Sequence, residues 1–358
     1  MPSLKEIKGR INSISSTLAI TSAMKMVASA KLQKAQMAIQ NMLPYERRLY
    51  SMLLDLMGAM NISAAASEDG SVRGSGSAER GFDQSCDRLS LSNRHDLAGM
   101  DGAYSLMAQR EVRKVAIVAF ASNSSLCGAF NSNAIREATA VINEYRASGL
   151  RDSDIVVYSV GRKMAEAMRK LGFPSPADFT KMSDSPSYEA ASALAQELFD
   201  GFVSGRFDKV ELVYNHYKST SSQPTTRQTY LPLSLADATA DIQVGKITDS
   251  ASESDTNRGA EPVGAPVVRQ GSPTTEDLIV EPSKEELIAT LLPKVVRLRV
   301  FTTLLDSTAA EHAARTVAMQ LATDNGNDLL QELTLEYNKG RQQKITSEIL
   351  DLVGGSMQ

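Results

Sequence analysis

The chain has 358 residues, enough for two structural units, and 42% of them are hydrophobic, so it can bury a sizeable core. Its formal net charge is −4, yet residues 1–48 carry eight Lys or Arg against two Asp or Glu, so a basic character is confined to the start of the chain. Nucleic-acid binding is not indicated, because Tyr45 is the only aromatic residue among these cations. No apolar run reaches the roughly 18 residues that a membrane span requires. Two cysteines, Cys86 and Cys127, argue against a disulfide framework and for a reducing compartment.

The first predicted element is a long helix over residues 1–60, about 85 Å long if it reaches residue 57. A seam runs along it with alternating spacings of four and three residues, which is the repeat of a coiled coil. The seam consists of Ile7, Ile11, Ile14, Leu18, Thr21, Lys25, Ala28, Leu32, Ala35, Ile39 and Met42. The alternative is an amphipathic helix on a globular core, but such helices usually stop by about 20 residues. Because its two central seam positions are polar, we expect the middle of this helix to do more than pair.

Residues 61–110 are rich in Gly, Ser and Asp and have little periodicity, which predicts a flexible insertion. Residues 111–234 then alternate between strand and helix patterns. The predicted strands are residues 115–120, 155–161, 209–219 and 226–233. Such alternation predicts a small, mostly parallel α/β sheet domain with helices on its faces.

The chain lacks the common catalytic and cofactor motifs. No G-x-x-x-x-G-K-[ST] phosphate loop, G-x-G-x-x-G turn or G-x-S-x-G elbow is present. His95, His216 and His312 lie far apart without metal-ligand spacing, and Cys127 has no histidine near it in sequence. We therefore expect no catalytic site, no cofactor and no bound metal, and we interpret Cys127 as a small buried residue at a strand–loop junction.

A second insertion, residues 235–282, is acidic and is interpreted as a solvated loop. A second long helix follows over residues 283–358, about 100 Å long. Ser283 and Glu286 form a capping box, and Pro293 is a possible kink. Coiled-coil spacing recurs at Leu287, Leu291, Val295, Leu298 and Leu305, and again at Leu330, Leu333 and Tyr337. Two long seams at opposite ends of the chain predict an antiparallel coiled coil with the α/β sheet domain at one end.

Three segments resemble the γ subunit of F-type ATP synthase: "LKEIKGRINSISSTLAITSAMKMVASAKLQKA", "LCGAFNSN" and "EHAARTVAMQLATDNGNDLLQELTLEYNKGRQQKITSEILDLVGG". The resemblance implies a central rotor shaft, one copy per complex, inside a ring of three α and three β subunits that holds the nucleotide sites. It also implies that the sheet domain is a foot that binds the ε subunit and the membrane c-ring. The shaft would couple proton or sodium flow to ATP synthesis or hydrolysis.

The loop before "LCG" departs from the family, because "SNSS" stands where a charged pair is usual. The paired-cysteine switch of the chloroplast type is not available, since only Cys127 lies in the sheet domain. These features, with no transit peptide, indicate a bacterial protein on the cytoplasmic face of the inner membrane, peripheral and without direct membrane insertion.

The resemblance suggests two sets of contact residues. Contacts to the α/β ring are expected at Thr21, Met24, Lys25, Lys31, Arg315, Thr323, Asp324 and Asn325. Contacts of the foot to ε or the c-ring are expected at Tyr214, His216 and Lys218. The end of the second helix, "ITSEILDLVGG", would extend alone into an apolar bearing. Two alternatives remain: a scaffold built on an antiparallel coiled coil, and an α/β enzyme with helical arms for oligomerisation.

Overall fold

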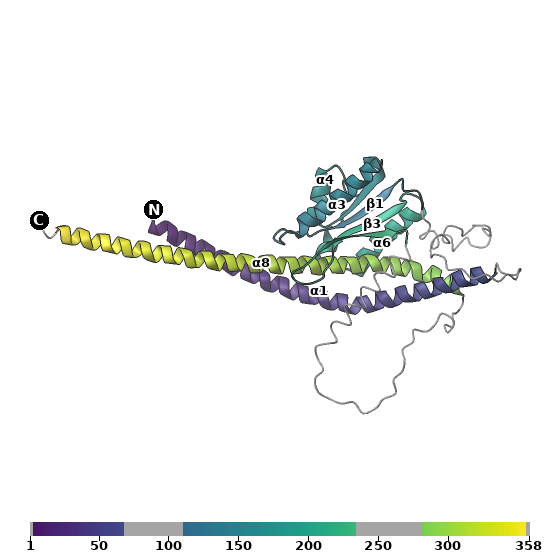
Figure 1. Ribbon diagram of the computed structural model, residues 1–358, viewed down its shortest axis with the longest axis horizontal. Coiled ribbons are helices and arrows are strands. Elements are labelled where there is room, and N and C mark those ends of the chain that lie inside the picture. The colour runs from purple at the N-terminus through teal and green to yellow at the C-terminus, as the bar shows by residue number, and fades with distance from the viewer. Residues whose placement is uncertain (1–2, 68–109, 234–280, 282, 356–358) are drawn as a thin grey trace, which may run out of the picture.

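Two long helices form the axis of the molecule, and a small α/β domain lies against one side of them (Figure 1). The computed structural model describes residues 3–67, 110–233, 281 and 283–355. Helix α1 covers Leu4–Ser67 and helix α8 covers Lys284–Gly355. Helix α1 thus continues seven residues past the boundary expected at residue 60, and the two predicted insertions lie almost entirely outside the described residues.

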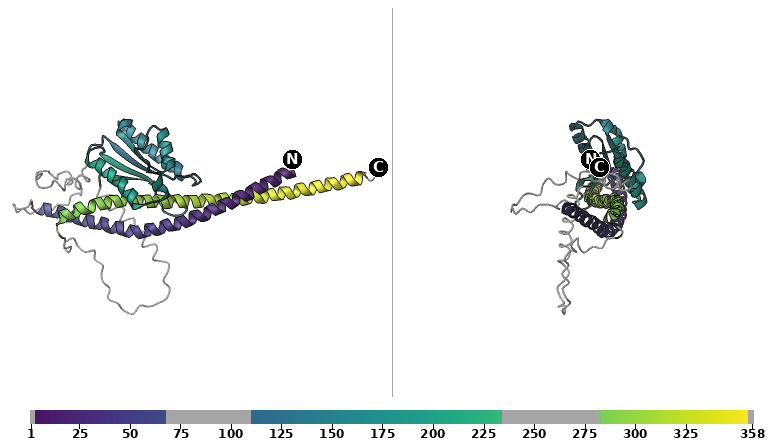
Figure 2. Two further views of the ribbon diagram at one scale, coloured as in Figure 1. Left: turned by 180° about the vertical axis from the view of Figure 1, so that it is seen from behind. Right: turned by 90° about the vertical axis from the view of Figure 1, so that its right-hand side faces the viewer.

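Helices α1 and α8 run antiparallel, as predicted. At one end Leu4 lies against Gly340, and further along Leu18 lies against Gly326. Towards the other end Arg299 of α8 forms an ion pair with Glu46 of α1 at 3.1 Å. Residue numbers therefore rise along α1 as they fall along α8, and both views in Figure 2 show the helices side by side.

The predicted seam of α1 is confirmed residue by residue. All eleven of its positions, from Ile7 to Met42, are buried or half-buried, whereas the positions between them are mostly exposed. The same spacing continues to Glu46, Leu49, Leu53 and Leu56, which are all buried. Pro44 lies inside α1 and Pro293 inside α8, and both helices continue through them.

The sheet has four strands in the order β2-β1-β3-β4. Strands β1 (Val115–Phe120), β2 (Ile155–Val160) and β3 (Lys209–Asn215) are parallel, and β4 (Thr225–Leu231) is antiparallel to β3. The prediction of a mostly parallel sheet is confirmed. Strand β3 ends four residues earlier than predicted, because the chain turns at His216, whose backbone N–H donates to the carbonyl oxygen of Pro224 at 2.9 Å.

Both faces of the sheet are covered, which explains why β1 is a continuous apolar run rather than an alternating one. Its odd-numbered residues pack with helices α3 (Phe130–Ala147) and α4 (Arg162–Lys170). Its even-numbered residues pack with helix α6 (Tyr188–Val203) and with the two long helices. The short helices η2 (Asp152–Asp154) and α5 (Thr180–Asp184) lie in the connections.

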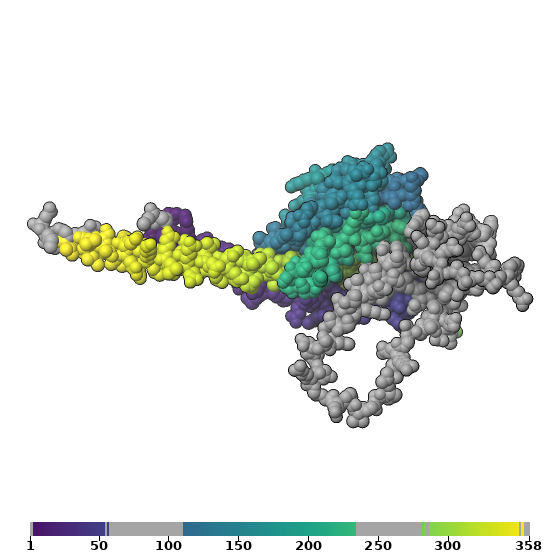
Figure 3. Space-filling view, in the orientation of Figure 1, coloured from purple at the N-terminus to yellow at the C-terminus, as the bar shows by residue number. Residues whose placement is uncertain are grey.

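The attachment of the domain divides α8 into a covered part and a bare part. From Ile288 to Met319 the residues of α8 are buried or half-buried on almost every side. Beyond Leu321 only the positions facing α1 are half-buried, and beyond Gly340 the described residues of α8 are exposed. The space-filling view shows this end emerging uncovered (Figure 3). The expectation that the last segment extends past α1 is met by the structure.

Candidate functional site

The candidate site is the part of the shaft where the cover of the sheet domain ends. We call residues 21–31 of α1 together with residues 309–325 of α8 the waist. Small side chains form its interior: Ala309, Ala310 and Ala313 are 0% exposed and Ala28 is 2% exposed. Since alanine side chains project little from a helix, the two helix axes can approach closely here.

One predicted pair of waist residues meets in the structure. The hydroxyl of Thr323 donates to Thr21 Oγ1 at 3.2 Å, and Thr21 donates to the carbonyl oxygen of Leu18 at 3.1 Å. One turn further along, a Cβ on Gly326 would lie 2.6 Å from Leu18 Cδ2. Thr21, one of the two polar seam positions, is therefore satisfied within the helix pair.

The other predicted waist residues are not brought together. Lys25 is half-buried on the seam, and among the described residues it has no hydrogen bond or ion pair to Arg315, Asp324 or Asn325. Asp324 instead accepts from Gln320 on its own helix at 2.8 Å. Met24, Lys31, Asp324 and Asn325 are exposed. Their side chains are thus available to a protein that surrounds the shaft.

Glu311 is a waist residue that sequence reasoning missed. Its Oε1 accepts from Arg315 Nη2 at 2.6 Å, and the two side chains are 10% and 19% exposed. Burial raises the pKa of Glu311 to about 7, with a further rise from Asp184, although the cations Arg315 and Lys31 oppose it. In sequence the pair resembles an ordinary exposed helical ion pair. It is buried only because α1 and the sheet domain cover it.

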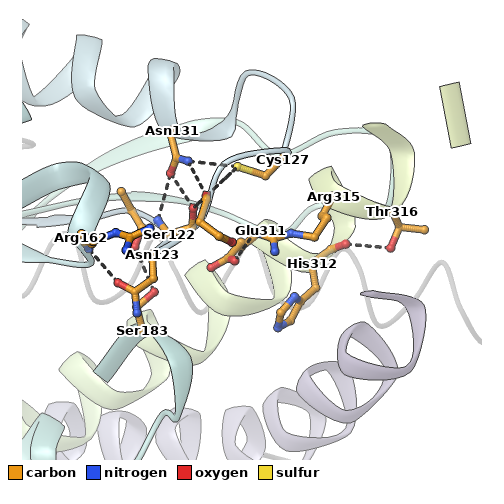
Figure 4. A network of polar contacts seen from close by, with 12 residues as sticks. Ser122, Asn123, Cys127, Asn131, Arg162, Ser183, Glu311, His312, Arg315 and Thr316 are labelled. Atoms are coloured by element: carbon orange, nitrogen blue, oxygen red, sulfur yellow. Dashed lines mark hydrogen bonds and ion pairs between the residues drawn. The ribbon is translucent and has the colours of Figure 1, made fainter. Parts of the chain in front are cut away.

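His312, next to Glu311, is held in its neutral form. Burial, and then the nearby cations Arg315 and Lys31, lower the pKa of His312 to about 4. Its Nδ1 and the Nε of Arg315 are buried and have no hydrogen-bond partner within the described part of the chain. Figure 4 shows these side chains beside the loop that follows β1.

The loop that follows β1 is held by side-chain hydrogen bonds. Ser122 donates its backbone N–H and its hydroxyl to Asn131 Oδ1, both at 3.0 Å, and Asn131 Nδ2 donates to Cys127 Sγ at 3.1 Å. Cys127 is 1% exposed, as expected for a packed residue. Leu126 is 58% exposed and has a φ of 69°. Gly128, with a φ of 58°, lies against Ala318 of α8. The loop therefore presents one apolar side chain at the edge of the waist.

The residues expected to contact ε or the c-ring lie at the end of β3 and in the connection that follows it. Tyr214 is 9% exposed and belongs to the core, and His216 Nδ1 is 2.6 Å from Asp306 Oδ2 of α8. Lys218 is exposed. All three lie at the edge of the sheet nearer the shaft tip, because β3 runs in the same direction as α8. Their geometry gives no support to a foot contact, which stays a prediction for these residues.

Within the described ranges, no group of three or more His, Cys, Asp or Glu side chains could hold a metal ion. No described helix is long and apolar enough to cross a membrane. What these residues build is mechanical: a two-helix shaft with a closely packed waist, a bare tip and a small α/β domain fixed to its other half. The fold thus defines a class of shaft-like proteins.

Comparison with known proteins identifies the family. A family model described as ATP synthase matches residues 3–357. The chain is 47% identical to the ATP synthase gamma chain of Phocaeicola vulgatus and 45% identical to that of Bacteroides thetaiotaomicron, covering 100% of both chains in each case. In fold it is similar to a rotor chain of the Euglena gracilis mitochondrial ATP synthase, with a TM-score of 0.50, 19% identity and coverage of 96% of this chain and 98% of that one. The chain belongs to the ATP synthase γ chain family.

Proposed function

We propose that this protein is the central rotor shaft of an F-type ATP synthase and has no catalytic site of its own. It couples ion flow through a membrane c-ring to ATP synthesis or hydrolysis in an α3β3 ring. One copy acts in each complex, with the sheet domain as a foot that meets ε and the c-ring on the cytoplasmic side of the membrane. Each nucleotide state of the ring favours one shaft angle by making different contacts with it.

The observation that carries the proposal is an apolar surface on the bare part of the shaft. On α1, Ile20, Met26 and Val27 are 58%, 68% and 58% exposed. On the single-helix tip of α8, Ile349 and Leu352 are 55% and 74% exposed. Exposed apolar surface on this scale indicates contact with another protein. A sleeve around the waist and tip would cover it while the sheet domain stays outside.

Purification of the complex tests the proposal. The full chain, tagged on its sheet domain, should be isolated from detergent-solubilised membranes together with α, β, ε and c subunits. The ratio of α to β to this chain should be 3:3:1. The chain alone should not hydrolyse ATP. A chain that purifies with unrelated partners would favour the scaffold alternative. Turnover of ATP by the isolated chain, surviving removal of contaminating ATPases, would favour an enzyme.

The waist cations allow a finer test. Lys25→Ala should lower coupled ATP synthesis more than it lowers assembly, because Lys25 lies on the seam without a partner among the described residues. Arg315→Ala should do the same, and it also removes the ion pair with Glu311. A lost charge-assisted contact with the ring costs about 1.5–3 kcal/mol, which is small beside the whole interface. The measurement is proton pumping, hydrolysis and subunit content in membranes, with Arg151→Ala on the exposed surface of the sheet domain as control. If both waist variants couple like the control, these residues do not contact the ring.

A further inference from the structure

The connection between β3 and β4 is a hairpin loop, residues 216–224, which we call the neck hairpin. His216 N–H donates to the carbonyl oxygen of Pro224 at 2.9 Å, and Ser219 and Ser222 exchange two backbone hydrogen bonds at 3.1 and 3.2 Å. The hairpin is therefore braced internally. It begins where β3 ends, at the edge of the sheet that lies beside Asp306 of α8.

Asp306 binds the neck hairpin with both carboxylate oxygens. Its Oδ1 accepts from the backbone N–H of Tyr217 at 2.9 Å, and its Oδ2 lies 2.6 Å from His216 Nδ1. The Asp306 side chain is 17% exposed. Two consecutive hairpin residues thus engage one side chain of α8, which fixes both the position and the orientation of the hairpin on that helix.

Tyr217 joins the hairpin to the other helix as well. Its ring packs with an apolar cluster in which α1 contributes Leu32 and Ala35, and α8 contributes Ala309 and Ala313. Its hydroxyl accepts from Gln36 Nε2 of α1 at 2.5 Å. The ring also packs with Cys127, Phe130 and Ala310, of which the first two belong to the sheet domain. One side chain therefore touches α1, α8 and the sheet domain together.

This position is mechanically important because the side chains of the two helices interlock only weakly here. Three of the four buried cluster residues at this level are alanines, whose small side chains make few contacts, so contact between the helices alone opposes their rolling past one another weakly. The packing between the sheet domain and α8 around Leu292–Leu304 is mostly apolar, and apolar burial has no preferred direction. Two hydrogen bonds accompany it, from Tyr230 to the carbonyl oxygen of Val296 and from Arg297 to Gln196, but both reach α8 alone. Hydrogen bonds are directional, and the neck hairpin supplies them to both helices.

We propose that the neck hairpin is a torsional clamp, through which turning force passes between the sheet domain and both helices of the shaft. Tyr217 is its central residue, and Asp306 and Gln36 are its anchors on α8 and α1. The inference rests on the proposed rotor function. It adds to that function the place where the sheet domain is fixed to both helices of the shaft. His216, whose contact with ε or the c-ring stays a prediction, takes part in this clamp through Asp306.

The test measures torsional stiffness in the whole synthase. The α3β3 ring is immobilised, a bead is attached to the c-ring, and the angular spread of the bead is recorded while the rotor pauses. Tyr217→Ala should increase the variance of that angle at least twofold. Tyr217→Phe keeps the ring and loses only the hydroxyl, so its variance should lie between Tyr217→Ala and the parent. Asp306→Asn, which weakens the anchor on α8, should also increase the variance.

Ser221→Ala is the matched control, because Ser221 is an exposed residue of the same hairpin. It should leave the variance at the parental value. The clamp would be overturned if the angular variance were the same in this control and in Tyr217→Ala, Tyr217→Phe and Asp306→Asn, all measured in complexes of normal subunit content. That result would leave the rotor function standing. If Tyr217→Ala does not assemble, Tyr217→Phe and Asp306→Asn decide by the same criterion. If the parent complex shows no rotation, the proposed function and the clamp both fail.

Discussion

Burial changes the chemistry of individual residues at the waist. Glu311 and His312 are neighbours in sequence, and each has a pKa shifted towards its neutral form, to about 7 and about 4 respectively. Burial is the leading cause of both shifts, since taking a charge out of water disfavours the charged form. Next to them Arg315 keeps an ion pair with Glu311 at 2.6 Å. Between about pH 4.5 and pH 6.5 these two residues therefore carry less charge in the folded chain than their ordinary pKa values suggest.

The two shifts affect stability in opposite directions. Between its ordinary pKa of 4.5 and its folded pKa of about 7, Glu311 holds its proton more tightly in the folded chain than in the unfolded chain. Its contribution to the free energy of unfolding therefore falls as pH rises. Between its folded pKa of about 4 and its ordinary pKa of 6.5, His312 holds its proton less tightly in the folded chain. Its contribution to the free energy of unfolding therefore rises with pH. The two partly cancel in the range where both operate.

Glu311→Gln should expose this balance. The free energy of unfolding of the parent relative to this variant should fall by up to about 3 kcal/mol between pH 4.5 and pH 7, because 2.5 pKa units correspond to roughly that energy. Urea unfolding of the purified chain across this range provides the measurement. Glu336→Gln, at an exposed position of the same helix, should give a flat difference. A flat difference for Glu311→Gln as well would show that its carboxyl is solvated.

At the scale of elements, the two long helices depend on a close approach that is set by glycine. A Cβ placed on Gly326 of α8 would lie 2.6 Å from Leu18 Cδ2 and 3.1 Å from its Cγ. A Cβ on Gly9 of α1 would meet nothing within 4 Å. The two glycines are both inside long helices, so they differ mainly in what lies opposite them.

This difference predicts opposite effects of the same substitution. Gly9→Ala should raise the free energy of unfolding by about 0.5–1 kcal/mol, because alanine favours the helix over glycine. Gly326→Ala gains the same preference, but overpacking against Leu18 costs about 1–3 kcal/mol, so a net loss of about 1 kcal/mol is expected. Denaturant unfolding of the two variants gives the comparison. A gain of equal size in both would mean that Leu18 moves aside freely.

At the scale of the whole molecule, residues 68–109 lie between helix α1 and the sheet domain in the sequence. This segment is rich in Gly, Ser and Asp, and its sequence has little periodicity. Because α1 extends to Ser67, a deletion that tests this segment must begin beyond that helix.

Replacing residues 70–107 by a short Gly/Ser linker should leave assembly with the α3β3 ring and coupled ATP synthesis close to parental levels. The seam residues and the apolar core are untouched by this deletion, and such linkers behave as flexible coils. Subunit content and ATP synthesis in membranes are the measurements, with removal of residues 45–56 as a contrasting deletion inside α1. Loss of the complex in the linker variant would assign the segment a structural or partner-binding role.

Local patterns in the sequence determined most of the architecture. Each of the eleven positions from Ile7 to Met42 that the four-and-three spacing predicted is buried or half-buried, because the repeat depends only on helix geometry. The apolar runs of β1 and β2 predicted buried parallel strands, since strands covered on both faces have no polar side. The antiparallel pairing of the chain ends followed from two long seams that neither end could satisfy alone.

Only the tertiary structure decided what surrounds each part of α8. Its spacing alone describes one seam, yet Ile288–Met319 is covered on almost every side because the sheet domain packs there. That cover buries Glu311, and it also brings Tyr217 to Gln36, 181 residues earlier in the chain. Periodicity reports which face of a helix is apolar, but the partner that meets the remaining faces depends on how distant elements pack. For that reason the seams could be predicted from the sequence, whereas the buried ion pair and the neck hairpin could not.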